Sequence, residues 1–306
     1  MSRVSTQTQA GAVDQSPELE DLKKRSQFWD IWRRLRRNKL AMLGLIIVLV
    51  LVLSAIFANF IAPYDYAQQD LTNMKAWPSR EHLLGTDDYG RDILSRIIYG
   101  GRVSLLVAIL SIVFGLIVGG ILGISAGYFG GIYDGTVMRI MDIVMAIPGF
   151  LLAVCISAAL GSGVLNTAIA IGIGCVPGYA RLLRALVLSI REQEYVEAAR
   201  ATGASDLRIM FRQIVPNILS PVIVESTLRI GGCILMISSL SFIGLGVQPP
   251  TPEWGNILNN GMDNLYEFAT RWHVIVFPAL FIILTMLAFN LLGDGLRDAM
   301  DPRMRK

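Results

Sequence analysis

Long stretches with few or no charged residues are the feature that most limits what this chain can fold into. A helix that crosses a bilayer needs about 20 consecutive apolar residues. The chain is 53% hydrophobic and only 17% charged, which lies outside the usual range of soluble domains. The stretches long enough for a crossing are Leu40–Ala62, Val103–Ile132, Ile143–Ala180, Pro216–Gly246 and Trp272–Gly293. The sequence therefore predicts a membrane protein built of helices.

One of these stretches is too long for a single crossing. Ile143–Ala180 contains Gly161, Ser162 and Gly163, a composition typical of a tight turn, so we divide it into two spans. The prediction is then an all-α polytopic membrane protein with six transmembrane helices. The second span carries glycines at spacings that let another helix approach closely: Gly115, Gly119, Gly120, Gly123 and Gly127.

Lysine and arginine positions predict the orientation, because these residues are enriched in cytoplasmic segments. Residues 1–39 are rich in them, which places the N-terminus in the cytoplasm, and six crossings return the C-terminus there. The loop from Pro63 to Arg102 is an exception, with five basic residues on the outer side. Residues 1–17 are polar and predict a disordered tail. Helical spacing of apolar residues among the arginines predicts an interfacial helix that contains Phe28, Ile31, Trp32 and Leu35.

The longest cytoplasmic segment inside the chain lies between the fourth and fifth spans and reads as a helical hairpin. Good helix formers run up to Ala201, Gly203 allows the backbone to leave the helix, and Ser205 or Asp206 can cap the next one. The second helix is expected to present an apolar stripe and to stop at Pro216. The stripe comprises Leu207, Met210, Phe211, Ile214 and Val215. Such a hairpin is suited to a groove on another protein.

This hairpin resembles the EAA motif of ABC importer permeases. The match rests on Glu197-Ala198-Ala199, Gly203 and Pro216. The resemblance implies that the hairpin enters a cleft of a separate ATPase subunit. The expected coupling residues are Glu197, Ala198, Ala199, Gly203, Ala204, Asp206 and Pro216.

Three further motifs resemble the C-type permease subunits of dipeptide, oligopeptide and glutathione importers. They lie at Gly85–Arg96, Gln248–Gly255 and Asn290–Pro302, so that the resemblance covers roughly residues 25–306. It implies a type I ABC importer permease (MetI-like) core with one extra N-terminal helix, in the bacterial cytoplasmic (inner) membrane. We expect a disordered cytoplasmic tail (1–24), an interfacial helix with the first transmembrane helix (25–66), an extracytoplasmic loop (67–101), a permease core (102–295) with a coupling hairpin (190–216), and a cytoplasmic tail (296–306).

The partners follow from the resemblance and from what the chain lacks. It has no G-x-x-x-x-G-K-[ST] loop to hold phosphates, so ATP hydrolysis is expected on two separate ATPase subunits, and this chain is expected not to be an enzyme. A homologous B-type permease subunit, an extracytoplasmic solute-binding protein and membrane lipid complete the expected partners; no nucleic acid is expected. The cargo is expected to be di- or oligopeptides, with glutathione or a nickel complex as alternatives. An ATP-independent secondary transporter is the alternative from another class.

Two ionisable residues fall deep inside the fifth span. Glu225 and Arg229 are one helical turn apart and can form a salt bridge. Alternatively, Arg229 faces a water-filled path and meets a substrate carboxylate, because charges inside a membrane are often functional. Ser238 and Ser239 either line the same path or pack against a neighbouring helix. No cofactor or metal site is expected.

Three smaller expectations concern single side chains. The prolines of Gln248–Gly255 predict a rigid turn with Trp254 at the membrane interface, and a gate or receptor contact is an equal alternative. Arg139 and Asp142 are expected to pair locally in preference to a second contact with the ATPase. Cys155, Cys175 and Cys233 are expected to be small buried hydrophobes.

Overall fold

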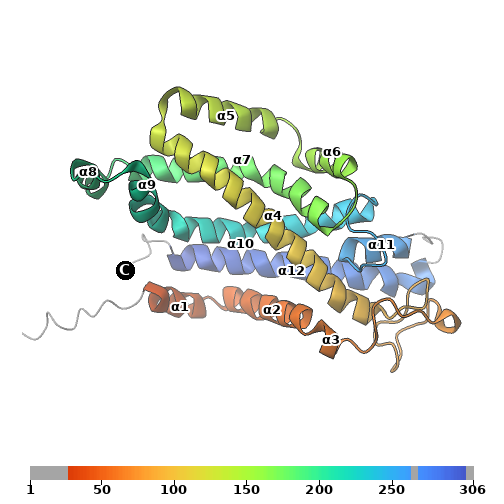
Figure 1. Ribbon diagram of the computed structural model, residues 1–306. Coiled ribbons are helices and arrows are strands. Elements are labelled where there is room, and N and C mark those ends of the chain that lie inside the picture. Colours follow the sequence, from red (N-terminus) through yellow and green to blue (C-terminus); the bar gives the residue numbers. More distant parts are fainter. Residues whose placement is uncertain (1–26, 263–267, 301–306) are drawn as a thin grey trace, which may run out of the picture.

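The computed structural model describes residues 27–262 and 268–300, and in this part of the chain nearly all regular structure is helical (Figure 1). Residues 1–26 and 301–306, which include most of the expected tails, lie outside the described residues. The longer helices are α1 (Gln27–Arg37), α2 (Lys39–Ile56), α4 (Ile93–Phe129), α5 (Gly131–Met145), α6 (Gly149–Leu160), α7 (Val164–Ile190), α10 (Val215–Phe242) and α12 (Phe268–Met300). Shorter helical segments are α3 (Ala58–Ile61), η2 (Leu71–Asn73), α8 (Glu194–Ala201), α9 (Asp206–Ile209), η3 (Met210–Ile214) and α11 (Trp254–Met262).

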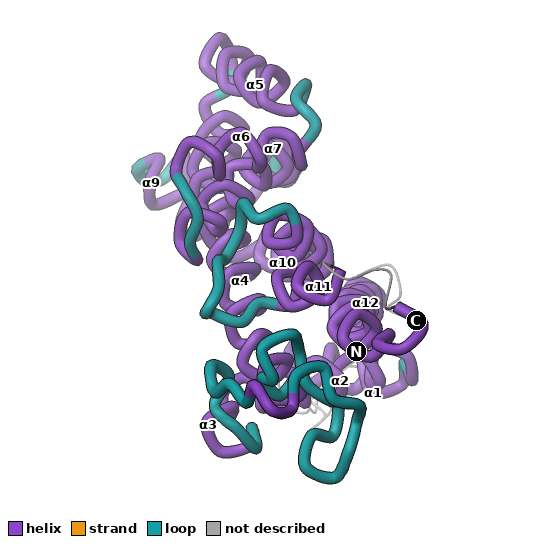
Figure 2. Tube along the Cα trace, turned by 90° about the vertical axis from the view of Figure 1, so that its right-hand side faces the viewer, coloured by secondary structure: helices purple, strands orange, loops and turns teal. Residues whose placement is uncertain are grey.

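Within the described residues, five helices are long and apolar enough to cross a membrane, and the bent pair α5 and α6 makes a sixth span. This confirms the predicted all-α polytopic fold. Viewed along the helices (Figure 2), the bundle extends from α5 at one edge, through α7, α10 and α12, to α1 and α2 at the other. The helices α1, α8 and α9 lie at one end of the bundle with the last residues of α12, while α3 and α11 lie at the opposite end (Figure 1).

The first span is anchored by the helix that precedes it. Asn38 caps α2, because its side-chain oxygen accepts hydrogen bonds from the backbone N–H groups of Leu40 and Ala41, both at 3.1 Å. Leu35 of α1 is buried in a small cluster with Ala41 of α2 and with Leu292 and Ala299 of α12. The expected helix among the N-terminal arginines is therefore present and packs on the last span.

The glycine face of the second span packs against α7, as predicted. A Cβ atom at Gly119 would lie 2.5 Å from the carbonyl oxygen of Val176, and one at Gly123 would lie 2.3 Å from that of Ala180. Both distances are shorter than contacts that real side chains make, so only glycine permits this approach. The helix is longer than expected, since α4 begins at Ile93 rather than at Val103. Asp92 caps it by accepting a 2.7 Å hydrogen bond from the Ser95 N–H, so the charged motif before the span is part of its first turn.

The third span is bent, which the division at Gly161–Gly163 did not predict. Its two helices α5 and α6 meet at 86° across a break at residues 146–148. Pro148 explains the break, because a proline disfavours helical backbone at the residue before it. The turn at Gly161 and Gly163 is confirmed, with φ angles of 81° and 139°. The expected pair of Arg139 and Asp142 is wrong: the Asp142 carboxylate pairs with Arg181 of α7.

The loop after α10 packs against the bundle, and Trp254 carries the contact. Trp254 is 1% exposed, and its indole N–H donates a 2.9 Å hydrogen bond to the carbonyl oxygen of Ile97. The ring lies against Gly100 and Gly101 of α4, where a Cβ atom would come within 3.2 and 3.0 Å of it. The prediction of an interfacial Trp254 is therefore wrong, and α11 instead braces α4 at this end.

Candidate coupling hairpin and intramembrane site

The segment between α7 and α10 forms the predicted helical hairpin. Its first arm, α8, ends in a Schellman arrangement, in which the Gly203 N–H bonds to the Arg200 carbonyl at 3.0 Å and the Ala204 N–H to the Ala199 carbonyl at 3.1 Å. Gly203 has a φ angle of 80°, a conformation that other residues rarely adopt. The predicted role of Gly203 in the turn is thus visible in the backbone.

The second arm continues into the membrane without interruption, contrary to the expectation that it stops at Pro216. Ser205 is the N-cap residue of α9, which passes through the π-helical turn η3 into α10. Pro216 stands just after this π-helical turn, where the continuous helix lacks one N–H donor. Within the expected apolar stripe, Met210 and Ile214 are buried, whereas Leu207 and Phe211 are 66% and 69% exposed.

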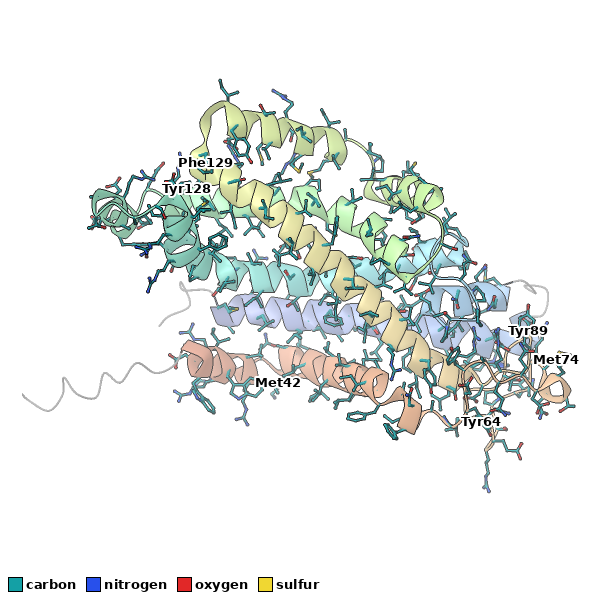
Figure 3. The ribbon with its side chains drawn as sticks, in the orientation of Figure 1. Met42, Tyr64, Met74, Tyr89, Tyr128 and Phe129 are labelled. Carbon is teal, nitrogen blue, oxygen red and sulfur yellow. The ribbon has the colours of Figure 1, made fainter. Side chains whose placement is uncertain are left out.

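A hydrogen bond fixes the hairpin to the end of α4. The hydroxyl group of Tyr128 donates to an Asp206 carboxylate oxygen at 2.6 Å, and the Arg200 guanidinium lies 5.9 Å from the centre of the same ring. Tyr128 stands with Phe129 beside α9 in Figure 3, far from the labelled Tyr64, Met74 and Tyr89. Asp206 is therefore a docking residue of the hairpin, a contact between residues 78 positions apart that the sequence analysis missed.

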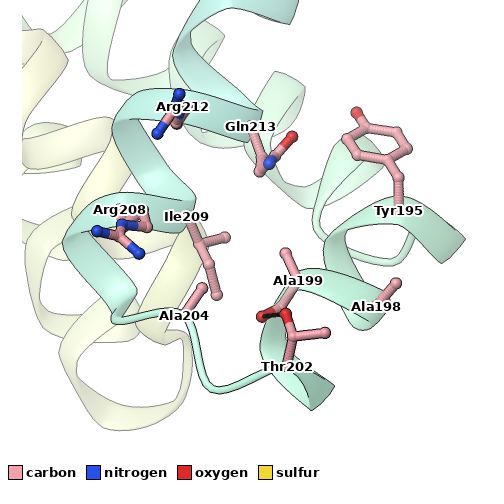
Figure 4. A pocket seen from close by; sticks show the side chains of 9 residues that line it. All are labelled: Tyr195, Ala198, Ala199, Thr202, Ala204, Arg208, Ile209, Arg212 and Gln213. Atoms are coloured by element: carbon pink, nitrogen blue, oxygen red, sulfur yellow. Dashed lines mark hydrogen bonds between the residues drawn. The ribbon is translucent and has the colours of Figure 1, made fainter.

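A pocket of about 440 Å³ opens between the two arms of the hairpin (Figure 4). Small side chains of α8 form one wall and two arginines of the second arm the other. The lining residues are Tyr195, Ala198, Ala199, Thr202, Ala204, Arg208, Ile209, Arg212 and Gln213. Of the predicted coupling residues, Ala198, Ala199 and Ala204 line this pocket, whereas Glu197 is exposed outside it.

The intramembrane charges form the salt bridge that their spacing predicts. An Arg229 nitrogen lies 2.8 Å from a Glu225 carboxylate oxygen, and both side chains are about one-third exposed, at 32% and 33%. The Arg229 guanidinium also lies 5.1 Å from the centre of the Tyr179 ring, and the Tyr179 hydroxyl donates to Ser226 at 2.9 Å. Arg229 is therefore held between its own helix and α7.

The thiols of two cysteines meet one turn further along the contact between α7 and α10. The sulfur atoms of Cys175 and Cys233 are 4.0 Å apart, and both side chains are buried, as predicted. Cys155 is exposed, so the same prediction for it is wrong.

The two serines of the expected pathway have different surroundings. The hydroxyl group of Ser238 is buried and donates to the Glu253 carboxylate at 3.3 Å, whereas that of Ser239 donates to the carbonyl oxygen of Leu235 in its own helix at 2.8 Å. Ser238 thus takes part in packing between segments.

Glu253 is a buried carboxylate that the sequence analysis missed. It is 0% exposed and accepts hydrogen bonds from the Ser104 hydroxyl at 2.9 Å and from the Gly255 N–H at 2.8 Å. Burial raises the pKa of Glu253 above its ordinary value of 4.5, and these hydrogen bonds oppose that shift. Glu253 links α4, α10 and α11 at the end opposite the hairpin.

The charged motif before the second span is also buried. Asp87, Arg91, Asp92 and Arg96 are each less than 5% exposed. An Asp87 oxygen accepts a 2.7 Å bond from Arg91 and lies 3.5 Å from Arg96, while Asp92 contacts His82 at 3.0 Å. Paired charges of this kind give the loop before α4 a fixed shape. The sequence showed the motif but not that it is buried.

The fold and the hairpin place the chain in the class of polytopic helical membrane proteins with a short helical hairpin at one end. Residues 111–306 match the family described as binding-protein-dependent transport system inner membrane component, and residues 26–78 match the N-terminal TM domain of oligopeptide transport permease C. The chain belongs to this family and is an ABC importer permease of the dipeptide, oligopeptide and glutathione type. The predicted resemblance is confirmed.

The chain is similar along nearly its full length to proteins named glutathione transport system permease protein GsiD. The one from Escherichia coli O6:K15:H31 is 44% identical over 295 residues, which cover 96% of each chain. The one from Shigella boydii serotype 4 is 45% identical over 282 residues, which cover 92% of each.

Solved structures support the core fold. Two structures of inward facing conformations of the MetNI methionine ABC transporter align with TM-scores of 0.53 and 0.54 at 19% identity. They cover 67% and 68% of this chain and nearly all of the matched chains. The predicted MetI-like core with an added N-terminal segment agrees with these matches.

Proposed function

We propose that this permease subunit imports short peptides, glutathione among them, with energy from ATP hydrolysis on separate subunits. The cargo class rests on the 44% identity over 96% of the chain to permeases named for glutathione transport, and on the match to the N-terminal domain of an oligopeptide permease. Peptides and glutathione share a carboxylate and backbone amides, so one pathway can serve both. A nickel complex remains the alternative cargo from the sequence analysis.

The hairpin pocket is the observation that supports coupling to an ATPase. Its small side chains leave room for an inserted residue, and the exposed Leu207 and Phe211 offer apolar surface beside it. In this proposal Ala198, Ala199 and Ala204 receive the ATPase, Glu197 contacts its surface, Gly203 shapes the turn, and Asp206 holds the hairpin on α4. Pro216 sets the first turn of α10.

The proposed assembly contains a homologous second permease, two ATPase subunits and an extracytoplasmic solute-binding protein. The shared end of α1, the hairpin and α12 faces the cytoplasm, with the chain in the bacterial inner membrane. The arginines of α1 and of the segment after α7 support this orientation. ATP-driven closure of the ATPase pair would then move the hairpin and, with it, α10.

Matched substitutions in α8 test the coupling role. Ala198 and Ala201 are both exposed alanines on the same short helix, but only Ala198 lines the pocket. We expect Ala198→Trp to fill the pocket, abolish co-purification of the ATPase subunits and stop peptide uptake in proteoliposomes. Ala201→Trp should leave both intact. Retention of ATPase and uptake by Ala198→Trp would refute the proposed docking site.

A further inference from the structure

A second cavity lies where α1 approaches α7, α10 and α12. Its volume is about 700 Å³. Several elements contribute to its wall, so it is a cavity of the folded chain and not a groove on one helix. The lining residues are Asp30, Ile31, Arg34, Leu182, Pro216, Asn217, Ser220, Pro221, Val224, Glu225, Leu228, Arg297, Ala299 and Met300.

The lining combines an apolar wall with two arginines, Arg34 and Arg297, and two carboxylates, Asp30 and Glu225. Leu182, Val224 and Leu228 supply apolar side chains from α7 and α10. Of the charged groups, Glu225 is neutralised by its salt bridge with Arg229. The guanidinium groups of Arg34 and Arg297 then face a single remaining carboxylate, that of Asp30. Within the described residues, neither guanidinium takes part in an ion pair.

The position of α1 places this cavity at the depth of a membrane surface. The helix ends at Arg37, and the first span begins at Lys39. Trp29 and Leu40 are 64% and 61% exposed, while the same segment carries Arg33, Arg36 and Arg37. Exposed apolar side chains among arginines are typical of a helix that lies between headgroups and acyl chains.

We propose that this cavity binds one phospholipid. Arg34 and Arg297 hold its phosphate by charge-assisted hydrogen bonds, and one acyl chain lies along Val224 and Leu228. The Asp30 carboxylate limits the negative charge that the cavity accepts, which favours a singly charged phosphodiester over a headgroup with more phosphates. The lipid thereby connects α1 to the first turns of α10. The inference does not depend on the cargo or on ATPase coupling.

Native mass spectrometry of the full-length chain in detergent, with phosphatidylglycerol as the probe, tests this site. Arg34→Gln with Arg297→Gln should weaken retention of one bound lipid by roughly ten- to thirtyfold, the loss expected for two arginine contacts. Arg33→Gln with Arg36→Gln is the matched control, because it removes the same charge from exposed positions outside the cavity. Arg34→Lys with Arg297→Lys keeps the charge and should retain the lipid.

The site would be refuted if both glutamine pairs weakened retention equally or if neither did. Loss of the lipid from the lysine pair would also refute it, because the effect would then reflect altered folding. Displacement of the lipid by inorganic phosphate alone would assign the cavity to a soluble anion. Displacement of the lipid by glutathione would show instead that the cavity belongs to the transport pathway of the cargo.

Discussion

Where α7 contacts α10, the neighbouring side chains fix the position of the Arg229 guanidinium group. Its guanidinium is paired with Glu225, stacked on Tyr179 and packed against Gly178, where a Cβ atom would lie 2.6 Å from a guanidinium nitrogen. A group held on three sides in this way keeps a defined position. With about one-third of its surface exposed, it is still able to meet a cargo carboxylate.

Paired substitutions separate a structural salt bridge of Arg229 with Glu225 from a contact of Arg229 with the cargo. We expect Arg229→Leu to abolish peptide uptake in proteoliposomes while the assembled complex still hydrolyses ATP, because the cargo loses its cationic partner. Glu225→Leu with Arg229→Leu removes both charges and leaves no unpaired carboxylate in the span. If uptake returned in this double variant, the pair would be structural and the contact with cargo would be excluded.

Glu253 makes the stability of the end opposite the hairpin depend on pH. Because its pKa is raised in the folded state, its contribution is fully present below the ordinary pKa of 4.5 and is lost as the pH rises through the folded value. We therefore expect Glu253→Gln to flatten the fall in melting temperature as the pH rises above about 4.5. Glu81→Gln, at an exposed position, should melt with the wild-type pH dependence. An unchanged slope in Glu253→Gln would contradict this assignment.

The local sequence was sufficient to predict the hairpin, but not to predict the contacts that join distant segments of the chain. The helix formers before Gly203 and the glycine itself act within a few residues, so the turn was predictable. The contacts of Tyr128 with Asp206 and of Ser104 with Glu253 join residues 78 and 149 positions apart, and no local pattern specifies them. The burial of Glu253 was missed for the same reason.

At the scale of elements, close approach of α4 and α7 depends on particular glycines. The glycines of α4 are not equivalent: a Cβ at Gly123 would clash with the Ala180 backbone at 2.3 Å, whereas one at Gly120 would meet only a Leu183 methyl carbon at 3.5 Å. The sequence predicted the glycine face but not which members are essential. It also missed the bend between α5 and α6, although Pro148 marked it.

Alanine at each of these two glycines provides a matched test. We expect Gly123→Ala to destabilise the protein by about 1–3 kcal/mol, because the helices must separate to accept the methyl group. Gly120→Ala should be neutral or slightly stabilising, since it relieves the conformational cost of glycine in a helix. Thermal unfolding of the two variants in one detergent measures the difference. Equal melting temperatures would show that α4 and α7 adjust without strain.

For the whole molecule, the described helices place α1, the hairpin and the last residues of α12 at one end of the bundle (Figure 1). This common end follows from six crossings, so it was predictable from the number of apolar stretches. The basic residues in the loop from Pro63 to Arg102 weakened the charge argument. The structure shows that Arg91 and Arg96 of that loop region are buried and paired, so they do not contribute to surface charge.

Thiol labelling in intact cells tests which side this end faces. In a Cys155→Ser background, which removes the exposed native thiol, we expect a membrane-impermeant reagent to label Trp77→Cys directly. Ala201→Cys on the hairpin, outside the pocket, should react only after the cells are permeabilised. Trp77 and Ala201 are both exposed, so access is comparable. The reverse pattern would invert the proposed orientation.

The continuity of the second hairpin arm with α10 has a mechanical consequence. Asp206–Phe242 is a continuous run of helical backbone that contains the π-helical turn η3 and two prolines, Pro216 and Pro221. Its first residue is bonded to Tyr128, and Ser238 near its far end is bonded to Glu253. A displacement of the hairpin therefore acts on the far end through a single helix, and the π-turn and the prolines near its start are where that helix bends most readily.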